Sequence, residues 1–255
     1  MGNIELKRVI PVLTIIGDKL VKTVQFKKPN YIGDPINAVK IFNDKEVDEV
    51  VLLDIRATQD KREPNYNKIE EICSEAFMPF AYGGGVQTIE QVNRLFNLGI
   101  EKIVLNSVLA DSLNLISQIA SRYGSQSIIA SIDVKKDLLG RTRIYSHSGC
   151  KKNKLQLDEY INIIVKEGIG EIFLNSINKD GTFQGYDLDL VTKISKISSV
   201  PVVICGGASD LNNFREAIDN GASAVAAGSL FVYRGDSKGI LINYPNKEIL
   251  KKNVY

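Results

Sequence analysis

The sequence is poor in the residues that disulfide frameworks, metal centres and membrane spans require. Its 255 residues include one histidine, three cysteines and no tryptophan. The cysteines, Cys73, Cys150 and Cys205, are odd in number and far apart, which argues against a disulfide framework or a zinc site and suits a reducing compartment. No apolar run approaches the roughly 18 residues of a membrane helix, and the start, MGNIELKR, lacks an apolar signal core. We therefore expect a cytoplasmic protein without a metal or another cofactor.

Charge of either sign is not in excess. There are 32 basic and 30 acidic residues, and the formal net charge is +2. This balance gives no reason to expect nucleic acid or a membrane surface as a partner. The chain also has no nucleotide P-loop, no G-x-S-x-G motif and no metal-ligand spacing. What remains is an ordinary globular composition, 44% hydrophobic and 24% charged, in a chain long enough for a large core.

Eight short apolar segments recur along the chain, and they are continuous rather than alternating. They are RVIPVL, EVVLLDI, MPFAY, KIVLN, SIIASID, EIFLNSI, VPVVIC and SAVAAGS. Such runs are typical of strands that are buried on both faces of a parallel sheet. Helical periodicity lies between them, as in residues 34–47 and 88–100, and Thr88 and Asp210 are expected N-caps. The alternation predicts an α/β fold, a (β/α)₈ TIM barrel.

An internal repeat organises the chain at an offset of 122 residues, which aligns residues 79–109 with 201–231 without a gap. The coinciding pairs are Pro79 and Pro201, Gly84 and Gly206, Gly85 and Gly207, Gly99 and Gly221, and Ser107 and Ser229. We interpret the repeat as two similar half-barrels, about 1–125 and 126–245, within a single domain, 1–255.

Small residues follow several predicted strands, at the end of the barrel where active sites lie. The candidate phosphate-binding residues are Gly84, Gly85, Asn106, Ser107, Asp180, Gly181, Gly206, Gly207, Gly228 and Ser229. Glycine has no Cβ, so an anion can approach the backbone N–H groups. They form two sets in register with the repeat, a first set within residues 84–107 and a second set of Asp180, Gly181 and residues within 206–229. Two such sets suggest a ligand with a phosphate at each end. The alternative is that the glycines only form tight strand-to-helix turns.

Two carboxylates, Asp54 and Asp133, end strands at the same face. Each is a candidate general acid or base or ligand contact, and the alternative for each is a loop-capping aspartate. The one histidine, His147, lies in the polar segment YSHSGCKK, where we expect a loop or hairpin and a solvated side chain.

The opposite ends of the strands carry charges of alternating sign. Arg8, Glu49, Lys102 and Glu171 lie just before or at strand starts. We expect a salt-bridge cluster at the base of the barrel, and from the residues alone a structural plug remains the alternative to a functional role.

Together these segments resemble HisF, the cyclase subunit of imidazole glycerol phosphate synthase, over nearly the whole chain. The motifs that carry the resemblance are RVIPVL, GDP, DEVVLLDI, PFAYGGG, YGSQSIIASIDVK, SINKDGTFQGYD, CGGA and AAGSLF. The resemblance implies a half-barrel duplication, a ligand with two phosphates, and a glutaminase (HisH-like) subunit docked at the strand-beginning face. Ammonia would pass from that face through the barrel, so the four charged residues match an ammonia gate, and Lys22 matches a lysine of the mobile loop after the first strand.

The chain departs from this family at one catalytic position. The family uses two aspartates, at the ends of the first and fifth strands. Asp133 matches the second, but Thr14 stands where the first is expected. A threonine is not ionised near neutral pH and is a poor proton carrier without an activating base. We therefore expect weak or absent cyclase (lyase) activity.

A closer resemblance is to the glycosyl amidation-associated paralogues called WbuZ. It is carried by LVKTVQFKKPNYIGDPINAVKIFN, FMPFAYGGG, SLFVYRG and the ending ILINYP. It implies a barrel that works with a glutaminase and a sugar amidotransferase, and that channels ammonia for amidation of a surface-polysaccharide sugar. The alternatives are an active cyclase subunit of histidine biosynthesis and a non-catalytic activator of a glutaminase. The sequence does not identify the sugar or the partner.

Overall fold

Eight parallel strands close into a barrel, which confirms the predicted (β/α)₈ architecture. The computed structural model describes residues 7–235 and 237–255. In order around the barrel the strands are β1 (Arg8–Ile16), β4 (Val50–Asp54), β5 (Phe80–Gly83), β6 (Lys102–Leu105), β7 (Ile128–Lys136), β10 (Glu171–Ser176), β11 (Val202–Cys205) and β12 (Ala224–Ala227). β12 pairs in parallel with β1 and so closes the sheet. All eight coincide with the predicted apolar segments, because a strand covered on both faces needs no polar alternation.

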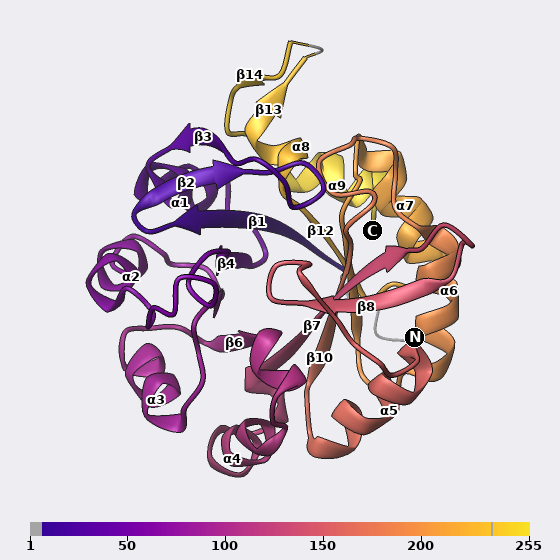
Figure 1. Ribbon diagram of the computed structural model, residues 1–255. Coiled ribbons are helices and arrows are strands. Elements are labelled where there is room, and N and C mark those ends of the chain that lie inside the picture. The colour runs from indigo at the N-terminus through magenta and orange to yellow at the C-terminus, as the bar shows by residue number, and fades with distance from the viewer. Residues whose placement is uncertain (1–6, 236) are drawn as a thin grey trace, which may run out of the picture.

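Helices surround the strands, as Figure 1 shows. They are α1 (Pro35–Asp44), α2 (Tyr66–Cys73), α3 (Ile89–Asn97), α4 (Asn114–Tyr123), α5 (Leu157–Glu167), α6 (Leu188–Ile197), α7 (Leu211–Asp219), α8 (Ser229–Val232) and α9 (Lys247–Asn253), with short 3₁₀ turns η1 (Ser107–Ala110) and η2 (Ser125–Ser127). Both predicted N-caps are confirmed: Thr88 forms a capping box with Gln91, and Asp210 accepts from the Asn213 N–H. In the described part of the chain, every helix is too short or too polar to cross a bilayer.

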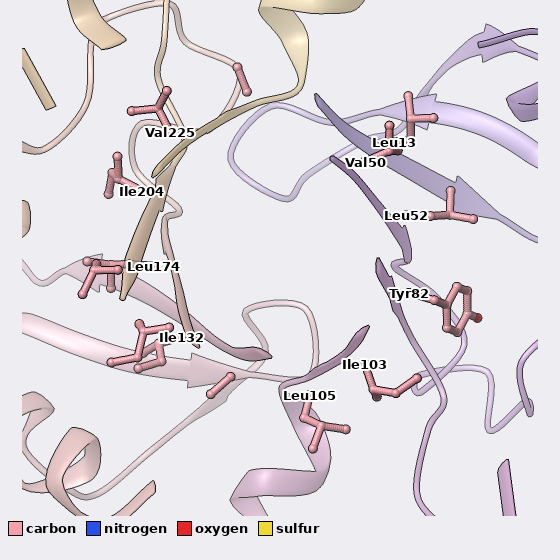
Figure 2. Close-up of a cluster of buried hydrophobic side chains, with 14 of the residues drawn as sticks. Leu13, Val50, Leu52, Tyr82, Ile103, Leu105, Ile132, Leu174, Ile204 and Val225 are labelled. Atoms are coloured by element: carbon pink, nitrogen blue, oxygen red, sulfur yellow. The ribbon is translucent and has the colours of Figure 1, made fainter. Parts of the chain in front are cut away.

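Side chains of the barrel strands alternate between two separate cores. Those that point outward pack under the helices, and Figure 2 shows this layer, including Leu52, Ile132 and Leu174. Those that point inward fill the barrel axis. The inner core consists of Ile10, Val12, Val51, Ala81, Val104, Ile129, Phe173, Val203, Cys205, Ala224 and Ala226. The inward positions lead from the strand beginnings, through this apolar layer, to the strand ends.

Short strands outside the barrel extend it at the carboxyl ends. β2 (Lys19–Lys22) and β3 (Asn30–Gly33) form an antiparallel sheet with the end of β1, and β8 (Thr142–Ser146) and β9 (Lys151–Lys152) do the same with β7. β13 (Tyr233–Arg234) and β14 (Gly239–Ile240) form a separate hairpin. We did not predict these strands, although the hairpin expected around His147 is present. Figure 1 shows β2 and β3 beside β1, outside the ring of strands.

Candidate functional site

One cavity of about 600 Å³ opens at the carboxyl ends of the barrel strands. Its lining includes all the residues that we proposed for catalysis, phosphate binding or other ligand contact. These are Thr14, Lys22, Asp54, Gly84, Gly85, Asn106, Ser107, Asp133, Asp180, Gly181, Gly206, Gly207, Gly228 and Ser229. Residues from both repeats therefore meet in one space, while the roles assigned to them remain predictions.

Two of the glycines are required by the backbone itself. Gly84 has a φ of +121°, and a Cβ there would lie 2.5 Å from the carbonyl oxygen of Asp54. Gly206 has a φ of +94°, and its Cβ would lie 2.8 Å from the carbonyl oxygen of Ser176. Ser176 follows Asp54 by the offset of 122 residues that separates the two glycines. The tight-turn explanation therefore holds for this pair, and a ligand role would be additional.

Lys22 places a buried cation against the second set of candidate phosphate-binding residues. Its side chain is 6% exposed, and a Cβ added to Gly228 would lie 1.9 Å from Nζ. Burial lowers the pKa of the Lys22 ammonium, and the charge of Asp180 opposes that effect. A desolvated cation at a cavity wall is a natural site for an anionic group of a ligand.

Asp133 is the best candidate for proton transfer. It is 7% exposed and accepts a hydrogen bond from the Asn106 amide at 3.1 Å. Burial and the nearby charge of Asp180 raise its pKa to about 7, against the opposing hydrogen bonds from Asn106 and Asn175. A carboxyl group that is half protonated near neutral pH can serve as either acid or base.

Thr14 is the counterpart of Asp133 in the strand register. Thr14 lies opposite Leu53 in β4, and Asp133 lies opposite Asn175 in β10. Asn175 follows Leu53 by 122 residues, so the two strand pairs correspond. The Thr14 hydroxyl donates a hydrogen bond to the carbonyl oxygen of Val21. Its one proton is therefore engaged with the backbone.

Asp54 behaves as a loop cap rather than as a free acid or base. Its carboxylate accepts from the N–H groups of Arg56 and Ala57 at 3.1 and 3.0 Å and forms a salt bridge with Arg62 at 3.2 Å. This arrangement fixes the loop after β4, so the capping alternative accounts for the residue.

His147 is only partly solvated, which our expectation of a solvated side chain did not foresee. The side chain is 26% exposed and lines the cavity, with Nδ1 3.0 Å from the Ser146 hydroxyl and Nε2 3.9 Å from a carboxylate oxygen of Asp111. The reason is the antiparallel return of β8 along β7, which carries the polar segment back over the barrel mouth. Asn175 and Cys205 also line the cavity and were not predicted as site residues. Asn175 and Cys205 each lie two residues after an inward-facing residue, Phe173 and Val203, and this spacing in a strand could have predicted that they also face the barrel axis.

The four charged residues at the strand beginnings form the expected salt-bridge cluster, a closed ring of alternating charges. Arg8 pairs with both Glu49 and Glu171, and Lys102 approaches the same two carboxylates at 2.9 and 3.6 Å. The glutamates are 1% and 6% exposed. Burial alone would lower the pKa of Arg8, but the hydrogen bonds and charges of Glu171 and Glu49 raise it overall. The ring lies at the strand beginnings, the end of the barrel opposite the cavity.

The strand β10 connects the ring to the cavity. Glu171 belongs to the ring, Phe173 lies in the inner apolar core, and Asn175 lines the cavity. Phe173 is 1% exposed. No group of three or more His, Cys, Asp or Glu side chains within residues 7–235 and 237–255 is arranged to hold a metal ion.

Comparison with known proteins assigns the chain to a family. The histidine biosynthesis protein family matches residues 8–238. A putative imidazole glycerol phosphate synthase subunit HisF of Leptospira borgpetersenii is 46% identical over 241 residues, which cover 94% of this chain and 95% of that protein. A putative subunit hisF2 of the same synthase from Pseudomonas aeruginosa is also 46% identical, over 94% and 96% of the two chains. The imidazole glycerol phosphate synthase subunit HisF of Petrotoga mobilis is 37% identical over 89% and 90%. The chain therefore belongs to the histidine biosynthesis protein family, as one of its HisF-like members.

Proposed function

We propose that this chain is the barrel subunit of a glutamine-dependent amidotransferase complex. A HisH-like glutaminase docks at the strand-beginning face, and its ammonia passes through the barrel. A sugar amidotransferase then uses that ammonia to amidate a sugar of a surface polysaccharide, as in the WbuZ-like paralogues. Ring closure, the reaction of a cyclase, is lost in this proposal.

The observation that carries the proposal is the neutral side chain at Thr14. Acid–base chemistry with two carboxylates needs an ionisable group at both strand ends. The Thr14 hydroxyl donates to the Val21 carbonyl oxygen, and its neighbour across the strand pair, Leu53, is apolar. Asp133 therefore has no second carboxylate at the corresponding position of β1, where Thr14 stands.

The inward-facing residues between the charged ring and the cavity support ammonia transfer. The salt-bridge ring lies at one end of the barrel, and the inner core that follows is apolar. An apolar interior suits neutral ammonia and disfavours ammonium, because burial of an unpaired charge is costly. The apolar inner core between Glu171 and Asn175 therefore favours passage of neutral ammonia over ammonium.

The pattern of similarity also supports a paralogue. Identity is 46% to two HisF-like proteins whose names carry the word putative, and 37% to two named as imidazole glycerol phosphate synthase subunits without it. The family match ends at residue 238, before the ILINYP segment at 240–245. The three cysteines are free thiols, which fits the cytoplasmic location that we predict.

A second candidate function is an active cyclase subunit of histidine biosynthesis. The specific observation that favours it is Asp133, whose pKa of about 7 suits proton transfer within a cavity lined by both glycine sets. On this alternative Asp133 would carry the acid–base chemistry alone.

The test of the conduit is the fate of the glutamine nitrogen in the complex with the glutaminase and the sugar amidotransferase of the same organism. Lys102→Met and Glu171→Gln each open the ring at one member. We expect both to release ammonia to bulk solution while glutamine hydrolysis continues. Lys193→Met, which breaks an exposed ion pair between α6 and Asp158 of α5, is the matched control. Unchanged transfer of nitrogen to product in both ring variants would refute the conduit.

A further inference from the structure

The segment beyond the family match folds back onto the strand beginnings. Residues 239–255 contain the whole of ILINYP, at 240–245, and the helix α9. The Leu241 and Asn243 N–H groups donate to carbonyl oxygens of α8, each at 3.0 Å. The Tyr244 ring packs against Phe42 and Phe231, with centroid separations of 6.5 and 5.2 Å. The segment is thus held by backbone hydrogen bonds to α8 and by aromatic packing against side chains of α1 and α8.

Two tyrosine hydroxyls of this segment reach the beginning of β1. The Tyr244 hydroxyl donates to the Val9 carbonyl oxygen at 2.9 Å. The Tyr255 hydroxyl donates to Oδ2 of Asp48 at 2.6 Å, and the same oxygen accepts from the Val9 N–H at 2.9 Å. Both polar backbone groups of Val9 are therefore held, one directly by the segment and one through Asp48.

The tyrosines remain donors over the ordinary pH range. Tyr244 is 3% exposed, and burial raises the pKa of its phenol. Burial raises the pKa of the Tyr255 phenol as well, and the Asp48 carboxylate adds to the effect. A protonated phenol is the form that these hydrogen bonds require.

The residues that these bonds fix are direct neighbours of the ring. Val9 follows Arg8, and Asp48 precedes Glu49. Arg8 is the ring member that pairs with both glutamates through hydrogen bonds. Because a side chain is placed by its own backbone, the tyrosine bonds set where the Arg8 guanidinium and the Glu49 carboxylate can meet.

We propose that Tyr244 and Tyr255 are positioning residues for the charged ring, which hold Arg8 and Glu49 in register so that the barrel entrance stays sealed. The functional consequence rests on the proposed conduit: a loosened ring would let ammonia escape before it enters the barrel. The ILINYP ending thereby acquires a physical role, and neither tyrosine touches a substrate.

The structural part is tested on the isolated full-length chain with variants that remove one hydroxyl each, Tyr244→Phe and Tyr255→Phe. Tyr123→Phe is the control, because its hydroxyl makes a bond of 2.6 Å to Asn93 between outer helices. We measure hydrogen exchange of the Val9 amide and of Arg8 Nε by NMR. We expect exchange about tenfold faster in the two variants, as the loss of one hydrogen bond implies, and unchanged in the control. Unaltered exchange in both variants, or an equal rise in the control, would overturn the inference.

The functional part uses the complex with the glutaminase and measures ammonia released to bulk for each glutamine hydrolysed. The double variant Tyr244→Phe, Tyr255→Phe should raise this fraction without a change in the rate of hydrolysis. If Lys102→Met raises it and the double variant does not, the positioning inference is wrong and the conduit stands. If Lys102→Met has no effect either, the proposed conduit itself is wrong and the functional consequence falls with it, while the exchange rates of the isolated chain alone decide the positioning role.

Discussion

Thr14 and Asp133 occupy corresponding positions at the ends of β1 and β7. Thr14 pairs with Leu53 of β4, and Asp133 pairs with Asn175 of β10. Leu53 and Asn175 are 122 residues apart, which is the offset of the internal repeat. The cavity is consequently asymmetric: one corresponding pair is a hydroxyl and an aliphatic side chain, and the other is a carboxyl group and an amide. Of these two corresponding positions, only the one on β7 carries a side chain that can act as a general acid or base.

Replacing Thr14 with aspartate should destabilise the barrel. Thr14→Asp removes the donor to the Val21 carbonyl oxygen and sets a carboxylate against that oxygen. We expect a loss of about 1–3 kcal/mol in the free energy of unfolding at pH 8 and a smaller loss at pH 5, where more of the new carboxyl group is protonated. Thr14→Val, which loses the hydrogen bond without adding charge, is the control in urea unfolding. Equal stability of Thr14→Asp and wild type at pH 8 would show that the site still accommodates a carboxylate.

Asp133 should make stability fall with rising pH. Its folded-state pKa of about 7 lies above the ordinary value of 3.8, so the folded protein binds more protons than the unfolded chain between those values. The stabilisation is fully present below about pH 4 and is lost as the pH rises through 7.

Asp133→Asn lacks this dependence. We expect the variant to gain stability over wild type from pH 4 to 7, by at most about 1.4 kcal/mol per pH unit, and the difference to level off above pH 7. Urea unfolding at several pH values measures it, and Asp44→Asn, an exposed carboxylate on α1, controls for the removal of one charge. A constant difference across the range would contradict the raised pKa.

Inorganic phosphate should stabilise the protein through Lys22. The buried ammonium against Gly228 lacks a salt-bridge partner within 4 Å among the described residues. With a millimolar dissociation constant, about 50 mM phosphate would add about 2 kcal/mol of stability. Thermal unfolding should show the shift in wild type and in Lys166→Met, an exposed control on α5, but not in Lys22→Met. No shift in wild type with phosphate or sulfate would argue strongly against the anion site.

Phe173 should limit passage along the barrel axis. It is the aromatic residue of the inner core and lies between the ring and the cavity. Phe173→Trp should lower glutamine-dependent amidation about tenfold, as a barrier increase of about 1.4 kcal/mol implies, and leave activity with external ammonium unchanged. Phe214→Trp overpacks the outer core instead and is the control. Equal losses with both nitrogen sources would indicate general damage and not a blocked path.

The barrel was predictable because its determinants are local. Continuous apolar runs predicted all eight strands, and Thr88 and Asp210 were correctly predicted as the N-caps of α3 and α7. Alternating charges at strand starts predicted the ring. The side chains that the barrel turns inward at the mouth were harder, since Asn175 and Cys205 sit in otherwise apolar strands and their direction follows from the stagger of the closed sheet. The contact of Tyr244 with Val9 spans 235 residues, and no local pattern encodes it.

The loss of ring closure is the central claim, and one assay tests it directly. The purified barrel is given the nucleotide intermediate of the histidine pathway with excess ammonia, so that neither a glutaminase nor a conduit is needed. Because a positioned general acid or base contributes about 10²–10⁴-fold to rate, we predict ring-closed product at a rate lower by that factor than in a two-aspartate cyclase assayed in parallel. Formation of the product at an ordinary enzymatic rate would contradict the account and establish Asp133 as sufficient.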